Sequence, residues 1–398
     1  MSFANALSGM QAASYELDVL GNNIANTETV GFKGSNARFG DVFANALGTT
    51  GQSGMGVQSL ADKTDFQPGT LTTTGRSQDV AIDGPGFFRF DHRGEAFYSR
   101  DGQLTLIPEG YLENARGARL VGYGAGGGTL QPLEISFDPM PGQPTTNMTM
   151  ALNLDAGAEA VPAGSSAGST FAARAEAYDT DGTPYDVQLA FTKVTDNEWQ
   201  LAARVADGSG NWVESTDSLA DLRFDANGQP VGETPRNLSF DLGGGNALAF
   251  TLDLSASTQF GNASAVREQS QDGYPRGEAD EVVIEADGRV VRHYTNEQTE
   301  VMGQIALAHF ASPQNLVQEG ENSWREAEGS GPAQMGLPGT HEAQRGVWGS
   351  LLGEAIETSN VELNQELIDL LGAQRAYQVN SKSASVQNEM LQTAINLR

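Results

Sequence analysis

The sequence predicts a mainly β-structured chain of 398 residues whose two ends are α-helices. Three observations lead to this prediction. Residues 360–398 contain no proline and only one glycine, Gly372, in a chain that has 48 glycines. Apolar residues recur at steps of three and four at both ends, which is the spacing of helices that pack against other helices. Between the ends, short runs of alternating apolar and polar residues are separated by glycine turns, as in β-sheets.

The first helix is expected to run from about Ser2, a candidate N-cap, to about Asn26. Ser14 and Gly21 interrupt its apolar stripe. The stripe consists of Phe3, Leu7, Met10, Leu17 and Ile24. A helix with few charges and internal glycines is only marginally stable alone in water. We therefore expect this helix to become ordered against partner helices.

No regular element is predicted from Thr27 to about Thr74. Four glycines (positions 48, 51, 54 and 56) with serines and threonines between them indicate an extended, adaptable arm over residues 28–74. A connection of this length inside a compact domain is expected to be functional or to become ordered against a neighbour.

Two β-domains are expected next. Residues 79–131 alternate short apolar runs with turns and predict a β-meander. A proline-rich stretch at 139–144 marks a boundary, and residues 171–260 have the regular short strands of a β-sandwich or barrel. Residues 280–311 return to the first style. We therefore assign 75–147 and 273–358 to one discontinuous β-domain, with 148–272 inserted into it as a second.

The C-terminal helix is expected over 360–398, and it pairs with residues 1–27 in a coiled-coil-like helical domain of 1–27 and 359–398. Three polar residues, Gln374, Ser381 and Asn388, fall on its apolar stripe. The apolar members of the stripe are Leu363, Leu367, Leu370, Tyr377, Ala384, Leu391 and Ile395. Narrow stripes at both ends of one chain indicate a molecule that assembles through its ends.

Composition excludes several classes of protein. The 51 acidic residues against 23 basic ones give a net charge of -28, which disfavours nucleic acids and anionic membrane surfaces as partners. The absence of cysteine excludes disulfides, a thiolate zinc site and a cysteine nucleophile. No apolar run reaches the ~18 residues of a membrane span, and the first residues lack the basic n-region of a signal peptide. By these rules the chain is expected to be soluble and cytoplasmic, unless it uses an export route without a cleaved signal.

No pattern for catalysis, a cofactor or a metal is found. The four histidines, at positions 92, 293, 309 and 341, stand far apart and outside any metal-ligand spacing. Residues 179–182 resemble the start of a calcium loop but lack its later ligands, and 124–128 lack the lysine of a P-loop. We therefore expect a structural protein with no cofactor, and not an enzyme.

Several segments carry a resemblance to a known family. Residues 22–33, from Asn22 to Lys33, resemble the N-terminal signature of the flagellar rod and hook proteins. Residues 359–363, 373–378 and 390–392 resemble the C-terminal signature of the same family, and 84–88 and 98–102 resemble its shared β-domain. Within 148–272, residues 177–184 and 258–264 are similar to the outer domain of the hook-forming members. One departure is Glu297, where the family usually has glycine.

This resemblance implies a function for each part. The terminal helices would pack with those of neighbouring copies into the inner tube of a helical homopolymer. The arm would lie between subunits, and the two β-domains would stack outward. The polymer would be the curved, flexible tube that transmits motor torque to the filament. Its implied partners are further copies of the chain, the distal rod protein, the hook cap, the hook–filament junction protein and the flagellar type III export gate.

The same resemblance implies export without a cleaved signal and a final place in the extracellular hook. Phe39 and Phe43 have the spacing of an export-gate motif. Residues expected to act in assembly are the helix stripes together with family-motif residues. These motif residues are Asn22, Asn23, Asn26, Thr27, Gly31, Phe32, Lys33, Asn360, Gln374 and Arg375. The close alternatives are a rod protein or a junction protein, which the insert disfavours. A secreted β-sandwich binding module or hydrolase is the rival from another class, and it gives no reason for heptads at both ends.

Overall fold

The computed structural model describes residues 3–43, 54–161, 168–207, 210–217, 219–243, 247–339, 341–342 and 346–396. The chain divides into two compact units. The first, here called the terminal unit, comprises Met1–Phe137, Glu281–His293 and Thr299–Arg398. The second, the inserted unit, comprises Asp138–Asp280 and Tyr294–Gln298. The predicted fold class, mainly β with helical ends, is confirmed.

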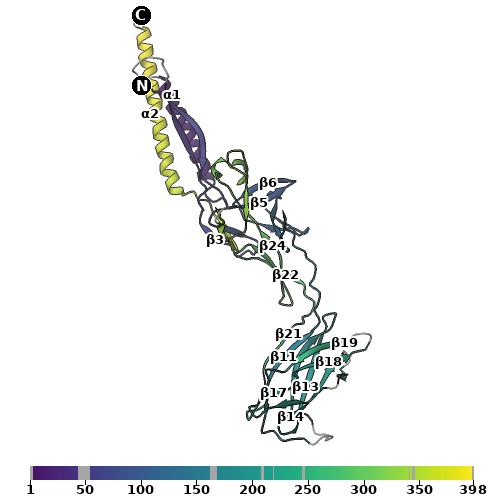
Figure 1. Cartoon of the computed structure of the whole chain (residues 1–398). Coiled ribbons are helices and arrows are strands. Elements are labelled where there is room, and N and C mark those ends of the chain that lie inside the picture. Colours follow the sequence, from purple (N-terminus) through teal and green to yellow (C-terminus); the bar gives the residue numbers. More distant parts are fainter. Residues whose placement is uncertain are drawn as a thin grey trace. The chain divides into compact units, whose positions relative to one another are not determined.

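Two α-helices lie side by side in the terminal unit (Figure 1). Helix α1 spans Phe3–Ala25 and α2 spans Leu363–Asn396. They run antiparallel, because Gly9 near the start of α1 lies against Asn380 while Asn23 near its end bonds Glu366 at the start of α2. The predicted helices are therefore confirmed, with α2 beginning three residues after Asn360. The predicted ends at Ser2 and Arg398 lie outside the described residues.

The face of α1 that packs within the chain is made of small residues rather than of the predicted stripe. Ala6, Ala13 and Leu20, spaced by seven residues, are buried. Phe3 and Leu7 of the predicted stripe are 49% and 40% exposed. The heptad spacing thus describes two neighbouring stripes, and the chain itself covers only the one with small side chains. None of the described helices is long and apolar enough to cross a membrane.

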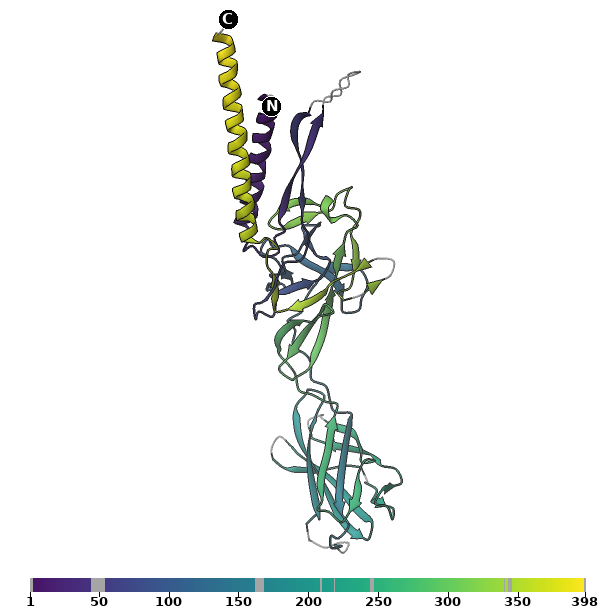
Figure 2. The same ribbon diagram turned by 90° about the vertical axis from the view of Figure 1, so that its left-hand side faces the viewer.

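The arm contains a β-hairpin (Figure 2). Strand β1 (Ser35–Phe43) pairs antiparallel with β2 (Gly54–Thr64), and both strands contact α1. Tyr15 donates a hydrogen bond to Asp62 across this contact, at 2.9 Å. The prediction of an irregular segment was therefore wrong for these strands. Glycine was interpreted as a strand breaker there, yet two-stranded pairing beside a helix tolerates it.

The β-structure of the terminal unit is a 13-stranded sheet with small two-stranded additions. Its main path is β22-β23-β24-β9-β5-β6-β27-β26, so strands from both halves of the chain alternate in space. A simple meander over 79–131 is therefore wrong, since β9 pairs with β24 as well as with β5. The strands are β3 (Leu71–Thr73), β4 (Val80–Asp83), β5 (Phe87–His92), β6 (Glu95–Ser99), β7 (Thr105–Leu106), β8 (Leu112–Glu113), β9 (Arg119–Gly124), β10 (Leu130–Pro132), β22 (Ala279–Ile284), β23 (Arg289–Tyr294), β24 (Thr299–Ile305), β25 (Leu307–His309), β26 (Val317–Gly320), β27 (Ser323–Arg325), β28 (Gln334–Gly336), β29 (His341–Glu342), β30 (Gly346–Val347), β31 (Ser350–Gly353) and β32 (Ala355–Glu357), with a short 3-10 helix at Pro313–Asn315.

The inserted unit is a β-sandwich. One sheet has the order β18-β19-β11-β20 with β21 on β11, and the other has the order β12-β13-β14-β16-β17 with β15 on β14. Both sheets contribute to one core, in which Leu152, Phe191, Trp199 and Phe240 are almost fully buried. The strands are β11 (Asn147–Asp155), β12 (Phe171–Tyr178), β13 (Pro184–Thr195), β14 (Glu198–Ala206), β15 (Trp212–Glu214), β16 (Leu222–Phe224), β17 (Pro230–Val231), β18 (Pro235–Asp241), β19 (Ala247–Asp253), β20 (Thr258–Phe260) and β21 (Ala265–Gln271).

Glu297 occupies a left-handed turn although it is not glycine. Its φ is 63°, and the Tyr294 and Gln298 backbones bond across the turn at 3.0 Å. An L-residue in this conformation costs about 1–2 kcal/mol. The turn is therefore kept in spite of the departure from the family's usual glycine, and Asn296 supports it by accepting from the Gln298 amide at 3.2 Å.

Candidate assembly site at the base of the terminal helices

Three segments that are far apart in the sequence meet where α1 ends and α2 begins. They are residues 31–35 after α1, residues 65–69 after β2, and residues 354–362 before α2. The Gly31 amide donates to the Glu357 carbonyl at 2.8 Å, and the Thr358 amide donates to the Thr70 carbonyl at 2.9 Å. Among the described residues no cluster of histidine and acidic residues is suited to a metal ion. The polar groups at this junction therefore have to be explained as structure.

A buried ion cluster joins these segments. Lys33 Nζ lies 2.5 Å from Glu357 Oε1, and Arg100 Nη1 lies 3.1 Å from Glu357 Oε2. The side chains of Lys33 and Glu357 are fully buried and that of Arg100 is 3% exposed. Lys33 also donates to the Gln67 carbonyl at 2.7 Å, and Glu357 accepts from the Gly69 amide at 2.7 Å. Burial lowers the pKa of both Lys33 and Arg100, and Glu357 opposes that shift. One carboxylate thus compensates two buried cations.

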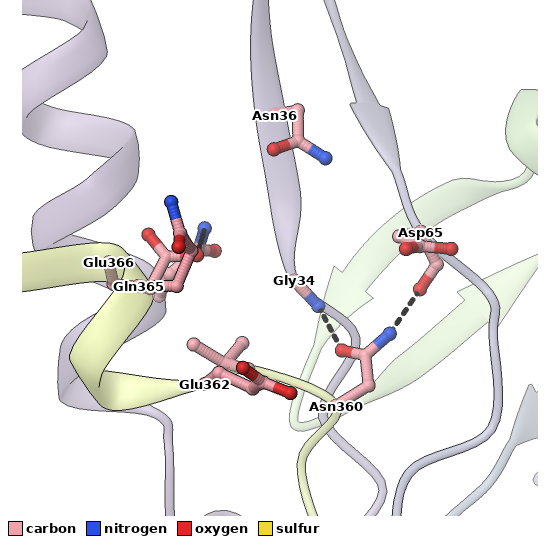
Figure 3. A pocket seen from close by; sticks show the side chains of 9 residues that line it. Gly34, Asn36, Asp65, Asn360, Glu362, Gln365 and Glu366 are labelled. Atoms are coloured by element: carbon pink, nitrogen blue, oxygen red, sulfur yellow. Dashed lines mark hydrogen bonds between the residues drawn. The ribbon is translucent and has the colours of Figure 1, made fainter. Parts of the chain in front are cut away.

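Two asparagine side chains complete the junction (Figure 3). Asn360 accepts from the Gly34 amide at 2.9 Å and donates to the Asp65 carbonyl at 2.9 Å. Asn23, which is 1% exposed, exchanges hydrogen bonds with the Ser35 backbone at 2.8 and 3.0 Å. It also donates to Glu366 of α2 at 3.2 Å. A carboxamide offers both donor and acceptor, so each asparagine satisfies backbone groups of two segments at once.

Gly31 and Phe32 fix the path of the chain between α1 and the hairpin. Gly31 has φ 68°, and a Cβ atom there would lie 2.6 Å from the Asp101 amide nitrogen. Only glycine combines this backbone conformation with so close an approach. The Phe32 side chain is 4% exposed. The junction is therefore a rigid connection and not a flexible linker.

An open cavity of about 240 Å³ lies beside these groups. Asn23, Asp65, Asn360, Glu362 and Glu366 line it. Partial burial raises the pKa of Glu366, and its bond from Asn23 opposes that change. The cavity is polar and acidic, and no described residue places a base in it.

Comparisons with known proteins identify the family. Family models match residues 3–33 (flagella basal body rod protein), 153–274 (flagellar basal body protein FlaE D2 domain) and 353–397 (flagellar basal body rod FlgEFG protein C-terminal). The flagellar hook protein FlgE of Salmonella typhimurium is 37% identical over 415 residues, which cover 100% of both chains. The chain belongs to the flagellar hook protein family. FlgE of Treponema pallidum is 28% identical over 100% of this chain and 99% of that one. The crystal structure of Helicobacter pylori flagellar hook protein FlgE2 shares the fold, with TM-score 0.53 and 15% identity over 72% of this chain and 100% of that chain.

Membership of the hook family agrees with the expected structural, non-enzymatic class and with a place in the flagellar hook. In this hook-family chain the junction brings together several predicted motif residues, namely Asn23, Gly31, Phe32, Lys33 and Asn360. Asn22, Asn26 and Thr27 instead bond one another or the last turn of α1, with Asn26 donating to the Asn22 carbonyl at 2.9 Å. These three residues end the helix and do not enter the ion cluster.

The predicted helix stripes lie at the surface of the terminal unit. Leu363, Leu367, Tyr377, Leu391 and Ile395 are 41–72% exposed, the highest value being that of Ile395. Gln374 and Arg375 are also exposed, and the half-buried members are Met10, Leu17, Ile24 and Leu370. Phe39 is half-buried on β1, and the side chain of Phe43 lies outside the described residues.

Glu357 was not among the residues predicted from the sequence. Its signal was weak but present, since Glu357 is an acid at the end of the strand Ala355–Glu357 and Lys33 follows an apolar residue. Arg100 lies in one of the segments that resemble the family, 98–102, but was given no role. Neither residue type is buried in proteins unless it is paired, so only the fold reveals that each needs the other.

Proposed function

We propose that the chain polymerises into the curved, flexible tube of the hook, which transmits torque from the motor to the filament. The observation that supports this is the row of large apolar side chains on α1 and α2 that the chain leaves exposed. Apolar surface of this extent and regularity marks a protein interface. The proposed inner wall of the tube consists of residues 1–27 and 359–398, with the arm of 28–74 between subunits. The β-domains of 75–147 with 273–358, and of 148–272, would lie further out.

A heterologous contact between identical chains produces an open helix rather than a closed ring. Bending of such a tube requires outer contacts that are small and polar and that re-form in new pairings. The strongly acidic composition suits such contacts, because like-charged surfaces do not lock together. The proposed further partners are the distal rod protein, the hook cap and the hook–filament junction protein.

Substitution of Leu367 and Leu391 by aspartate tests the polymer. Both side chains are exposed, 44% and 57%, so the folded monomer should keep its stability within about 0.5 kcal/mol. Tubes seen by electron microscopy under salting-out conditions should disappear, because a charge in an apolar contact is desolvated without a partner. Val231→Asp, at a 54% exposed position of the inserted unit, is the matched control and should leave the tubes intact. Tubes of normal yield from the double variant would contradict the proposed inner wall.

We further propose export through the flagellar type III gate, with Phe39 and Phe43 as the recognised pair and without a cleaved signal. Replacing both by alanine should abolish secretion while the far-ultraviolet circular dichroism of the purified protein stays unchanged. Val57→Ala with Leu60→Ala alters the partner strand β2 at exposed positions and should leave secretion intact. Normal secretion of the phenylalanine variant would refute the motif.

A further inference from the structure

The charged residues at the start of α2 are separated both along the helix and around it. Two acids, Glu362 and Asp369, come first, and two bases, Arg375 and Lys382, follow. Each base comes thirteen residues after one of the acids, which in a helix means about 20 Å further along the axis and roughly 140° around it. The acids thus lie on the side of α2 that turns toward α1 and β1, where they border two cavities. The bases lie on nearly the opposite side.

The basic side of α2 has no partner within the part of the chain that the structure describes. Arg375 and Lys382 are both exposed, and no described residue forms an ion pair with either. The same side carries large apolar side chains, Ile368, Leu371 and Val379, which are 62%, 53% and 62% exposed. An exposed surface that mixes apolar side chains with arginine is typical of a protein interface.

The acidic side offers places for long basic side chains. The cavity of about 240 Å³ is bordered by Asp65, Glu362 and Glu366. A second cavity, of about 420 Å³, lies between α1, β1 and α2 and is bordered by Glu16 and Asp369. Its walls include Val19, Leu20, Ala373 and Ala376. An apolar wall with a carboxylate at its rim suits a side chain with an apolar stem and a cationic head.

The spacing of the two sets of charges is the same. Seven residues separate Glu362 from Asp369, and seven separate Arg375 from Lys382, about 10.5 Å in each case. We propose that the basic side of α2 in one copy of the chain docks on the acidic side of α2 in the next copy, parallel and displaced by about 20 Å along the axis. Arg375 then faces Glu362 and Lys382 faces Asp369. The inference rests on the proposed polymer and adds its register.

The other charges of α2 are compatible with this register. Glu389 lies on the basic side and falls opposite the uncharged Ala376 of the next copy. Glu366 falls opposite Val379 and keeps its hydrogen bond from Asn23. No like charges are opposed, and the contact surface on one copy differs from the one it meets. Such a heterologous contact repeats without closing.

Two charge-reversed variants test the register. The first carries Arg375→Glu and Lys382→Glu, and the second carries Glu362→Lys and Asp369→Lys. Each alone opposes like charges at every contact, so the critical concentration for polymerisation should rise at least about tenfold. In an equimolar mixture an alternating copolymer pairs every charge again, and the critical concentration should return to within about threefold of the wild-type value. Glu389→Lys, on the basic side but opposite Ala376, is the control and should change it less than about threefold.

The outcomes separate the register from the polymer itself. Rescue in the mixture supports the pairing, since no effect confined to one chain restores assembly on mixing. Two variants that each polymerise as well as wild type overturn the pairing and leave the proposed polymer standing. Failure of the mixture, with the helical circular dichroism of both variants intact, overturns the pairing as well. A wild-type protein that stays monomeric in the same conditions overturns the proposed function.

Discussion

Replacing Glu357 by glutamine is expected to destabilise the terminal unit by about 3–5 kcal/mol. Glutamine keeps the size of the side chain and can still accept hydrogen bonds from Lys33 and Gly69. The substitution therefore removes only the charge, and it leaves two buried cations, Lys33 and Arg100, without compensation. In differential scanning calorimetry the transition of this unit should fall by roughly 6–20 °C, at about 2–4 °C for each kcal/mol.

Glu285→Gln is the matched control for that experiment. Glu285 pairs with Arg289 at 2.8 Å in the same unit, but the two side chains are 42% and 49% exposed. An exposed pair contributes about 0–1 kcal/mol, so the control should lower the transition by less than about 4 °C. Equal shifts in the two variants would mean that Glu357 is no more important than a surface acid, and the account of the junction would be wrong.

Gly31→Ala is the second substitution expected to have a large effect. The added Cβ would lie 2.6 Å from the Asp101 amide nitrogen and 2.9 Å from the Arg100 carbonyl carbon, both of which are backbone atoms that cannot rotate away. The left-handed conformation, φ 68°, costs an L-residue a further 1–2 kcal/mol. Together with overpacking, the loss of unfolding free energy should be at least about 3 kcal/mol. Chemical denaturation of the monomer measures it.

Gly21→Ala gives the opposite sign and serves as the control. Gly21 lies in α1, and a Cβ added there would have no neighbouring atom within 4 Å, so alanine meets nothing. Alanine in a helix is about 0.5–1 kcal/mol more favourable than glycine, and the variant should be more stable by that amount. A loss of stability in both variants, or in neither, would contradict the role given to the backbone at Gly31.

The helices and the two β-regions could be predicted because their signals are local. Steps of three and four residues identify α1 and α2, and alternation identifies the strands of the sandwich. The hairpin β1–β2 escaped prediction because its glycines disfavour strands, and its stability comes from contacts with α1 that no local pattern shows. The order of strands in the 13-stranded sheet could not be predicted either, since β9 and β24 meet across a long stretch of chain.

The candidate site was predictable only in part. The motif residues Lys33 and Asn360 were identified through the family resemblance, but their partners were not. Ala6 and Ala13, which form the helix contact inside the chain, were overlooked because small side chains give no hydrophobic signal of their own. The larger side chains that give the stripe its signal are the ones that the monomer leaves exposed. Periodicity therefore indicated a helix contact correctly and was uninformative about which contact lies within the chain.

The Lys33–Glu357 pair closes a loop of more than three hundred residues. Loop-closure entropy and the folding of long-range contacts make such a connection slow to form. The inserted unit, by contrast, is almost entirely one continuous segment, Asp138–Asp280, and its sheets form from neighbours in sequence. A nascent or emerging chain can thus complete the sandwich early, while Lys33 waits for its counter-charge until the last tenth of the polypeptide is present. Completion of the terminal unit is a check on chain integrity: a subunit cut short before Glu357 lacks the means to assemble.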